Sequence, residues 1–193
     1  MRGLMENWTT GLRLIAFLVV VLWCVEAVNS FNGHSLNSYG IYPRETSSLP
    51  GIFLWAFLHG SLHHLIMNTT PLLVMGFFVA TRGTGNFFIV SLVVILVGGL
   101  GVWCFGRSAY HIGASGLVFG YFGYLVALGI YERSLDTLAI ASLTVFYYGG
   151  IIFGVLPGDS FISWEGHLFG LCAGIFAARL TAKEKSSDDV RGL

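Results

Sequence analysis

Gly113-Ala114-Ser115-Gly116 stands directly before an apolar stretch that continues to residue 131 without a charged side chain. A second motif of the same kind, Gly166-His167-Leu168-Phe169-Gly170, opens another apolar stretch further along the chain. A serine or a histidine at the head of a membrane-length segment is costly to keep in lipid and therefore indicates a functional position. Together the two motifs predict a nucleophile and its base, buried in a bilayer.

Composition indicates the environment of these motifs. Of the 193 residues, 55% are hydrophobic and only 10% are charged, with a mean hydropathy of +0.76. Soluble domains carry about a quarter charged residues, so this composition predicts an integral membrane protein. The formal net charge is +0 and the chain has no basic run, which removes any electrostatic argument for a nucleic-acid partner.

The apolar runs predict the number of membrane crossings. A transmembrane helix needs about 20 mostly apolar residues, and the runs predict an all-α polytopic bundle of six transmembrane helices. They cover approximately residues 12–30, 61–81, 86–106, 115–131, 137–157 and 166–182. The long first loop, residues 31–60, is too polar to span and too apolar to be a solvated linker, so we expect an interfacial element. Residues 1–182 are expected to form one membrane domain, and residues 183–193 a polar, disordered cytoplasmic tail.

The placement of Lys and Arg predicts the orientation of the bundle. With the N-terminus in the cytoplasm, the eight that lie inside are Arg2, Arg13, Arg82, Arg133, Arg179, Lys183, Lys185 and Arg191. Only Arg44 and Arg107 lie outside. This bias predicts cytoplasmic N- and C-termini. The unusual polar residues then share the outer leaflet, so a site would open to the extracytoplasmic side. Nothing resembles a transit peptide, so the cell membrane is the expected location.

Ser115 requires a base, because a serine hydroxyl is a weak nucleophile until its proton is removed. His167 is the candidate base, since it lies at a matching depth. His64 and Asn68 are four residues apart and share one face of a helix. With the backbone N–H of Ser115, these two side chains can form an oxyanion hole. No aspartate is available to complete a triad, and Phe119, one turn below Ser115, can hold the imidazole instead.

The other polar and aromatic residues are given simpler roles. Glu165 is the one carboxylate near the required depth, and we expect it at the surface. His111 is a loop residue without an assigned role. The five tryptophans are expected to be mostly interfacial anchors, namely Trp8, Trp23, Trp55, Trp103 and Trp164. His59 and His63 have a spacing that could ligate a metal. No His-Glu-x-x-His arrangement is present, however, so neither a metal nor another cofactor is expected.

Small residues predict which helices bring the serine and the histidine together. Close helix packing in lipid requires small side chains at helical spacing. The segment from residue 115 offers Gly116 and Gly120. The segment from residue 166 offers an unbroken four-residue series, namely Gly166, Gly170, Gly174 and Ala178. The packing signal and the chemistry therefore fall on the same two helices.

Three motifs in this order resemble the rhomboid family of intramembrane serine proteases, in its six-helix core form. They are His59-x4-His64-x3-Asn68, Gly113-x-Ser115-Gly116 and His167-x2-Gly170-x3-Gly174. The resemblance implies a Ser115 nucleophile, a His167 general base, and substrates that are single-span membrane proteins with an unstable helix top and small residues at the cleaved bond. The candidate site also includes His64, Asn68 and Gly113 for oxyanion or substrate binding, with His59, Phe119, Gly116 and Gly170 in support.

Two other classes of function remain open. A non-catalytic relative could bind or guide membrane substrates, although such a protein would usually lack Ser115 or His167. A small transporter or channel could use the His/Asn cluster as a relay, but the spans show no inverted repeat and a transporter gives no reason for Gly-x-Ser-Gly. A serine-reactive fluorophosphonate separates these classes, because a transporter should not react at Ser115.

Overall fold

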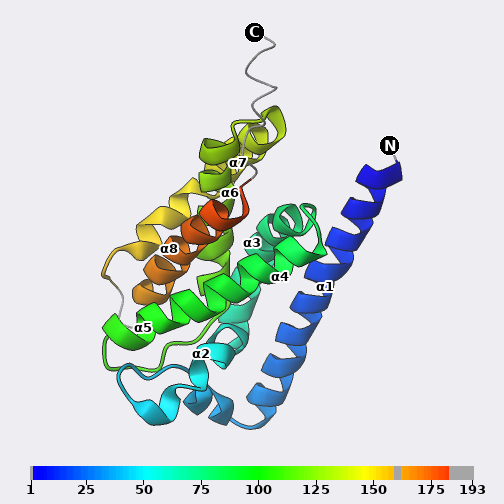
Figure 1. Ribbon diagram of the computed structural model, residues 1–193. Helices are drawn as coiled ribbons and strands as arrows, with labels where there is room; N and C mark the ends of the chain where they lie inside the picture. Colours follow the sequence, from blue (N-terminus) through cyan, green and yellow to red (C-terminus); the bar gives the residue numbers. More distant parts are fainter. Residues whose placement is uncertain (1, 159–161, 183–193) are drawn as a thin grey trace.

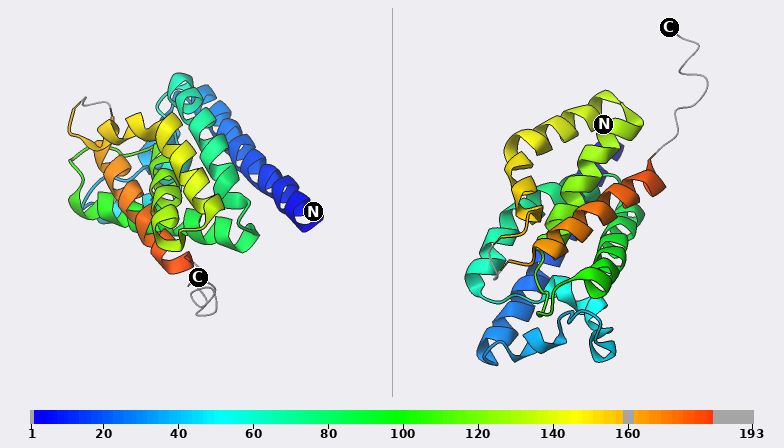
Figure 2. Two further views of the ribbon diagram at one scale, coloured as in Figure 1. Left: turned by 90° about the horizontal axis from the view of Figure 1, so that it is seen from above. Right: turned by 90° about the vertical axis from the view of Figure 1, so that its left-hand side faces the viewer.

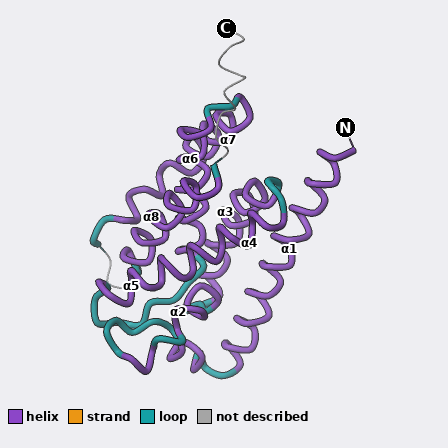
Figure 3. Tube along the Cα trace, in the orientation of Figure 1, coloured by secondary structure: helices purple, strands orange, loops and turns teal. Residues whose placement is uncertain are grey.

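Helices form almost all of the secondary structure in the computed structural model, which describes residues 2–158 and 162–182. Within these ranges there is no β-strand, only an isolated antiparallel bridge between Ile41 and His111. The longer loops gather at one end of the helical bundle, and short turns join the helices at the other end (Figure 3). The predicted tail, residues 183–193, lies outside the described residues.

Six long helical segments follow one another along the described chain (Figure 1). They are α1 (Arg2–Phe31), α3 (Leu62–Ala80), the continuous run of α4 (Thr84–Val93), η4 (Val94–Gly98) and α5 (Gly99–Phe105), then α6 (Ser115–Glu132), α7 (Leu135–Tyr148) with η5 (Gly149–Val155), and α8 (Trp164–Thr181). The first loop contains the short turns η1 (Ser35–Tyr39), η2 (Thr46–Ser48), α2 (Gly51–Leu54) and η3 (Trp55–Phe57).

Length and composition allow five helices in the described part of the chain to cross a membrane. They are Trp8–Phe31, Leu62–Ala80, Thr84–Phe105, Ser115–Glu132 and Leu135–Val155. The sixth predicted span corresponds to α8, which is not among these five helices. The count of six crossings therefore stays a prediction, as does the orientation. The start of α1 and the end of α8 lie at the same end of the bundle (Figure 1), as an even number of crossings requires.

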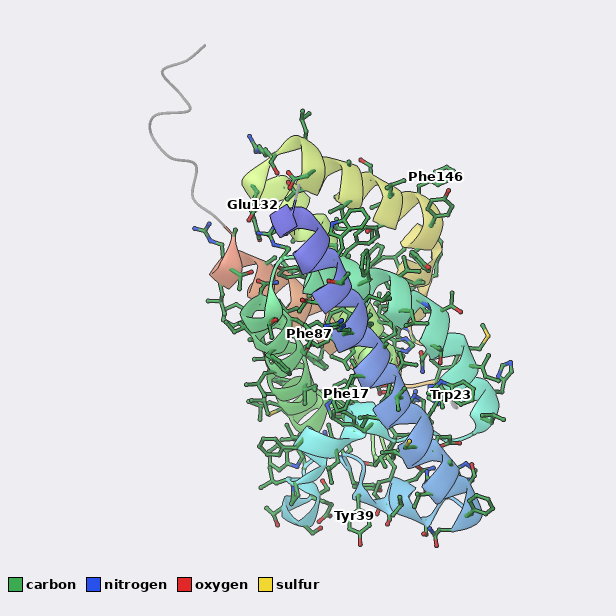
Figure 4. The ribbon with its side chains drawn as sticks, turned by 90° about the vertical axis from the view of Figure 1, so that its right-hand side faces the viewer. Phe17, Trp23, Tyr39, Phe87, Glu132 and Phe146 are labelled. Carbon is green, nitrogen blue, oxygen red and sulfur yellow. The ribbon has the colours of Figure 1, made fainter. Side chains whose placement is uncertain are left out.

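Large apolar side chains cover the outside of the bundle, as expected for a surface that contacts lipid. Phe146 on α7 is 79% exposed and Phe17 on α1 is 70% exposed (Figure 4). The helix α1 packs against α3 at the edge of the bundle (Figure 2). The centre is formed by α6, in which Tyr121 and Tyr124 are fully buried. Their hydroxyls bond to Ser91 and Asn86, at 2.7 and 3.1 Å, because a buried hydroxyl needs a partner.

The helices α6 and α8 pack backbone against backbone. A methyl group on Gly170 would overlap the carbonyl oxygen of Gly116, and one on Gly174 would overlap that of Gly120. The predicted pairing of the two small-residue series is therefore confirmed. Lipid offers no hydrophobic gain for helix association, so this close van der Waals contact stabilises the pair.

The first loop folds back under the bundle and reaches its core. Trp55 was expected at the membrane interface, but this was wrong: the residue is only 1% exposed. Its Nε1 donates to the carbonyl oxygen of Ile95 at 3.2 Å, and a methyl group on Gly116 would overlap its ring. The absence of a side chain at Gly116 thus leaves the space that the indole fills.

Candidate active site

A cavity of about 740 Å³ opens among the loops at one end of the bundle. It lies between α3, α6, η5 and the segment that leads into α8. Five of the predicted site residues line it, namely His64, Asn68, Ser115, Phe119 and His167. Side chains from three helices, far apart in the sequence, are therefore brought to one cavity.

Ser115 is the first residue of α6, and each of the last two residues in the loop before it donates a backbone hydrogen bond to the first loop. The Gly113 N–H donates to the carbonyl oxygen of Trp55 at 2.8 Å, and the Ala114 N–H donates to Nε2 of His59 at 3.2 Å. Gly113 has a φ of +125°, a conformation that favours glycine. The loop therefore enters α6 along one defined path, which places Ser115 at the wall of the cavity.

His59 is completely buried beneath this loop. Because its Nε2 accepts the Ala114 N–H, this ring nitrogen carries no proton. Burial lowers the pKa of His59, and the nearby His64 lowers it further, so the ring stays neutral and the hydrogen bond is maintained. This hydrogen bond holds the backbone before Ser115, which is a physical basis for the predicted supporting role of His59.

The alternative metal role of His59 and His63 finds little support in the geometry. The Nε2 of His59 is already engaged by the Ala114 N–H, and His63 lies exposed at the cavity. Among the described residues, no group of three or more His, Cys, Asp or Glu side chains could hold a metal ion. Independence from metal stays a prediction.

His167 is nearly buried in α8, and its imidazole is fixed from two directions. Its Nδ1 lies 2.8 Å from the carbonyl oxygen of Gly154. A carbonyl oxygen only accepts, so Nδ1 carries a proton and donates it. The Phe119 ring stacks on the imidazole, with centroids 4.1 Å apart and an interplanar angle of 6°. In the neutral ring, Nε2 is then left with a free lone pair.

His64 and Asn68 lie on the side of α3 that borders the cavity. The helix begins there because the Ser61 hydroxyl accepts the backbone N–H of His64 at 3.1 Å. Gly113 leaves room for the His64 ring, since a methyl group on this glycine would lie 2.7 Å from Cε1. The Nδ2 of Asn68 is buried and has no hydrogen-bond partner within the described residues. Such an atom is a donor available to a ligand.

Glu165 was expected at the surface, but this was wrong, because it is only 1% exposed. One carboxylate oxygen, Oε1, accepts the backbone N–H of Arg107 at 3.2 Å and lies 3.7 Å from the Nε of the same residue. The carboxylate is buried because the loop before α6 covers the start of α8 and supplies these donors. No local pattern in the sequence indicates this contact across the fold.

His111 was left without a role in the sequence, yet it is buried and makes two side-chain hydrogen bonds. Its ring nitrogens lie 2.7 Å from the Ser163 hydroxyl and 3.0 Å from the carbonyl oxygen of Arg107. Its position just before Gly113 was the only signal that could have suggested a link to the site. Like Glu165, it joins the loop before Ser115 to the segment that opens α8.

Comparisons with known proteins identify the relatives of this chain. The Rhomboid domain family model matches residues 46–184. An uncharacterised protein of Mycobacterium tuberculosis is 37% identical over 183 residues, which cover 90% of this chain and 76% of the relative. The putative rhomboid protease YdcA of Bacillus subtilis is 26% identical over 66% of this chain and 65% of its own length. The rhomboid protease GluP of the same organism is 32% identical over 63% of this chain and 24% of its own.

The family match covers more than half of the chain, including the loop before α6 and the start of α8. The mycobacterial relative exceeds 30% identity over most of both chains. The all-helical bundle, with several helices apolar enough to span a membrane, agrees with these matches. The chain therefore belongs to the rhomboid family of multi-pass membrane proteins.

Proposed function

We propose that this protein is an intramembrane serine endopeptidase, with Ser115 as the nucleophile and His167 as the general base. The observation that carries the proposal is the hydrogen bond from Nδ1 of His167 to the Gly154 carbonyl. This bond leaves Nε2 unprotonated in the neutral ring, and the ring lines the same cavity as the Ser115 side chain. A free imidazole lone pair that lines the same cavity as a serine at a helix start supports acyl transfer.

In the first step, Ser115 Oγ attacks the carbonyl carbon of the scissile peptide bond while Nε2 of His167 takes the hydroxyl proton. Ser115 and His167 both belong to the described part of the chain, and no hydrogen bond joins their side chains there. Such bonds are often long without substrate and tighten in the complex. The tetrahedral intermediate then expels the amine, which receives the proton from His167. The substrate acyl group is now bound to Ser115 Oγ as an ester. A water molecule gives its proton to the same Nε2 and attacks the ester carbonyl. The carboxyl product is released, and Nε2 returns the proton to Ser115 Oγ.

The negative charge that develops on the carbonyl oxygen needs donors already in place. The unpartnered Nδ2 of Asn68 supports this role, because a buried amide without a partner is otherwise costly. The His64 side chain and the Ser115 backbone N–H complete the proposed oxyanion hole. The contacts of Phe119 and Gly154 with His167 take the place of the aspartate of a triad.

The proposed substrates are single-span membrane proteins, cleaved near the outer leaflet where the helix top is unstable and the residues are small. A cavity of about 740 Å³ leaves room for water as well as for a peptide segment, since one water occupies about 30 Å³ in the liquid. If the termini are cytoplasmic, as the sequence predicts, this cavity opens to the extracytoplasmic side of the cell membrane.

The test is cleavage of a generic single-span substrate by the purified protein in detergent and in liposomes. Wild type should yield two products of defined size, and Ser115→Ala and His167→Ala should each abolish cleavage while retaining the wild-type melting temperature. Ser142→Ala, an exposed serine on α7, serves as the matched control and should cleave normally. A fluorophosphonate should label wild type at Ser115.

Normal turnover by Ser115→Ala or His167→Ala, free of contaminating protease, would contradict the dyad. Binding of the substrate by wild type without cleavage or labelling would instead favour the non-catalytic alternative, a rhomboid-like protein that guides membrane substrates.

A further inference from the structure

A relay of hydrogen bonds connects the loop before Ser115 to the first turn of α8. The Nε2 of His111 lies 3.0 Å from the carbonyl oxygen of Arg107 and must donate to it, because this oxygen only accepts. The Nδ1 of the neutral ring is then an acceptor. The Ser163 hydroxyl, 2.7 Å from Nδ1, donates to it. Each atom of the relay therefore has one defined role.

Ser163 is also the N-cap of α8. Its hydroxyl oxygen accepts the backbone N–H of Gly166 at 3.2 Å, and its carbonyl oxygen accepts that of His167 at 3.2 Å. Capping by a serine hydroxyl satisfies one of the free N–H groups at a helix start. Because the proton of this hydroxyl goes to His111, its oxygen is turned toward Gly166. This orientation fixes the first turn of α8, which carries His167.

His111 is itself held in place through its backbone. It exchanges two hydrogen bonds with Ile41 of the first loop, at 2.8 and 3.1 Å. Two residues later, the Gly113 N–H donates to Trp55, also in the first loop. The loop that sets the position of Ser115 is thus the same loop whose His111 ring sets the start of α8.

The charged groups that face His111 are Arg107 and Glu165. The Glu165 carboxylate forms a second link between the loop and α8, through the backbone N–H and the side chain of Arg107. Burial lowers the pKa of His111, although its hydrogen bond to the Arg107 carbonyl and the charge of Glu165 act in the opposite direction. At neutral pH the ring is therefore uncharged, as its acceptor role toward Ser163 requires.

We propose that His111 and Ser163 are positioning residues that set the placement of His167 relative to Ser115 through the cap of α8. This inference rests on the proposed function, because it assigns the two residues an effect on the general base. Both also border the cavity, so a direct contact with substrate is the alternative that the experiment must separate.

Steady-state cleavage by single variants separates these roles. A displacement of about 1 Å between reacting groups can cost on the order of 100-fold in rate. Ser163→Ala and His111→Leu should therefore lower kcat by about 10- to 100-fold, with KM within about twofold of wild type. Ser163→Thr keeps a hydroxyl that can both cap and donate, and it should restore most of the lost rate.

Ser134→Ala provides a matched control. Ser134 is the N-cap of α7 and accepts the backbone N–H of Thr137, but it does not line the cavity. Loss of this cap should lower the melting temperature about as much as Ser163→Ala does, with kcat unchanged. An equal loss of kcat in Ser134→Ala would overturn the proposal, as would a rise in KM at constant kcat in Ser163→Ala.

Amide hydrogen exchange tests the proposal without any cleavage assay. His111→Leu should speed exchange at the amides of Gly166 and His167, although it leaves the Ser163 side chain intact. Ser134→Ala should speed exchange only at the start of α7. Unchanged protection at Gly166 and His167 in His111→Leu would overturn the proposed positioning. If wild type does not cleave, but His111→Leu shows the expected faster exchange at Gly166 and His167, the result would contradict the proposed function alone.

Discussion

The Phe119 ring lies parallel to the His167 imidazole, with centroids 4.1 Å apart and an angle of 6° between the planes. The Gly154 carbonyl oxygen, 2.8 Å from Nδ1, holds the edge of the same imidazole. One contact fixes the tilt of the ring, and the other fixes its tautomer and its rotation. In the proposed dyad, this aromatic face and this backbone carbonyl would serve where a triad has a carboxylate.

Replacing Phe119 with leucine should reduce the rate of cleavage more than the stability of the protein. An aromatic pair contributes about 0.5–1.5 kcal/mol beyond its buried area, and loss of the ring allows the imidazole to tilt. We expect kcat to fall about tenfold in Phe119→Leu, measured under substrate saturation. Phe146→Leu, which changes an exposed phenylalanine on α7, is the control. Wild-type kcat in Phe119→Leu would show that stacking does not orient the base.

Removing the proposed oxyanion donors should lower the rate without abolishing it. Asn68→Ala and His64→Ala should each reduce kcat by about 10- to 1000-fold, a range that includes the loss of about 100- to 1000-fold on removal of one oxyanion donor from an acyl-transfer enzyme. Ile66→Ala, at an exposed position of α3 outside the cavity, should cleave normally. Unchanged turnover in both single variants would assign His64 and Asn68 to structure only.

The double variant Asn68→Ala/His64→Ala reveals whether the two donors act on the same oxygen. If they serve one hole, the loss in the double variant should be smaller than the two single losses combined. Strict additivity in activation free energy would instead indicate two independent effects.

Stability should depend on pH through His59. Burial lowers the pKa of His59 in the folded protein below its ordinary value of 6.5. The unfolded chain therefore binds more protons below this pH, so the free energy of unfolding is greatest above it and falls as the pH decreases. The melting temperature in detergent should decline from about pH 6.5 downward.

His59→Gln should make this decline shallower, because a glutamine oxygen can accept the Ala114 N–H without titrating. His111, whose pKa burial also lowers, accounts for part of the slope that remains. His63→Gln controls for the loss of an exposed histidine. The same slope in His59→Gln and wild type would argue against a titrating contribution of His59.

Chelation should leave cleavage unchanged. The Nε2 of His59 accepts the Ala114 N–H and is not available to a metal together with His63. We expect the same kcat before and after dialysis against EDTA, with no gain on adding Zn²⁺. Loss of activity with EDTA and its recovery with metal would support the His59–His63 pair as a metal site.

The sequence predicted the parts of the site that depend on helical periodicity. Gly170 and Gly174 follow the spacing of one helix face, and they contact Gly116 and Gly120 as expected. The four-residue spacing of His64 and Asn68 likewise brought both to the cavity. A helix repeats its geometry, so the face that a residue occupies can be calculated from its number.

The contacts made by loops could not be predicted in the same way. Gly154 holds His167 through its carbonyl oxygen, an atom that every residue carries and that leaves no pattern in the sequence. Glu165, His111 and Trp55 are buried because segments distant in the chain supply their partners. Their placement depends on the tertiary fold, and residue type alone favoured the surface or the interface for Glu165 and Trp55.

Replacing Gly170 or Gly174, at the contact between α6 and α8, with a larger residue should remove activity, although neither glycine can take part in the reaction. A methyl group on Gly170 would overlap the carbonyl oxygen of Gly116, and one on Gly174 would overlap that of Gly120. Gly170→Val and Gly174→Val should each destabilise the bundle by about 1–3 kcal/mol or more. The helices are forced apart, and a shift of about 1 Å between serine and histidine costs on the order of 100-fold in rate. Gly85→Val on α4 is the control, since nothing lies within 4 Å of a Cβ atom added there. Gly129, although outside this interface, cannot serve as a control, because a methyl group on it would lie 2.7 Å from Ala141 Cβ.

Melting in detergent and cleavage rates should be measured on the same samples. If Gly170→Val melts and cleaves like wild type, α6 and α8 are not paired through these glycines, and the serine and histidine must be brought together another way.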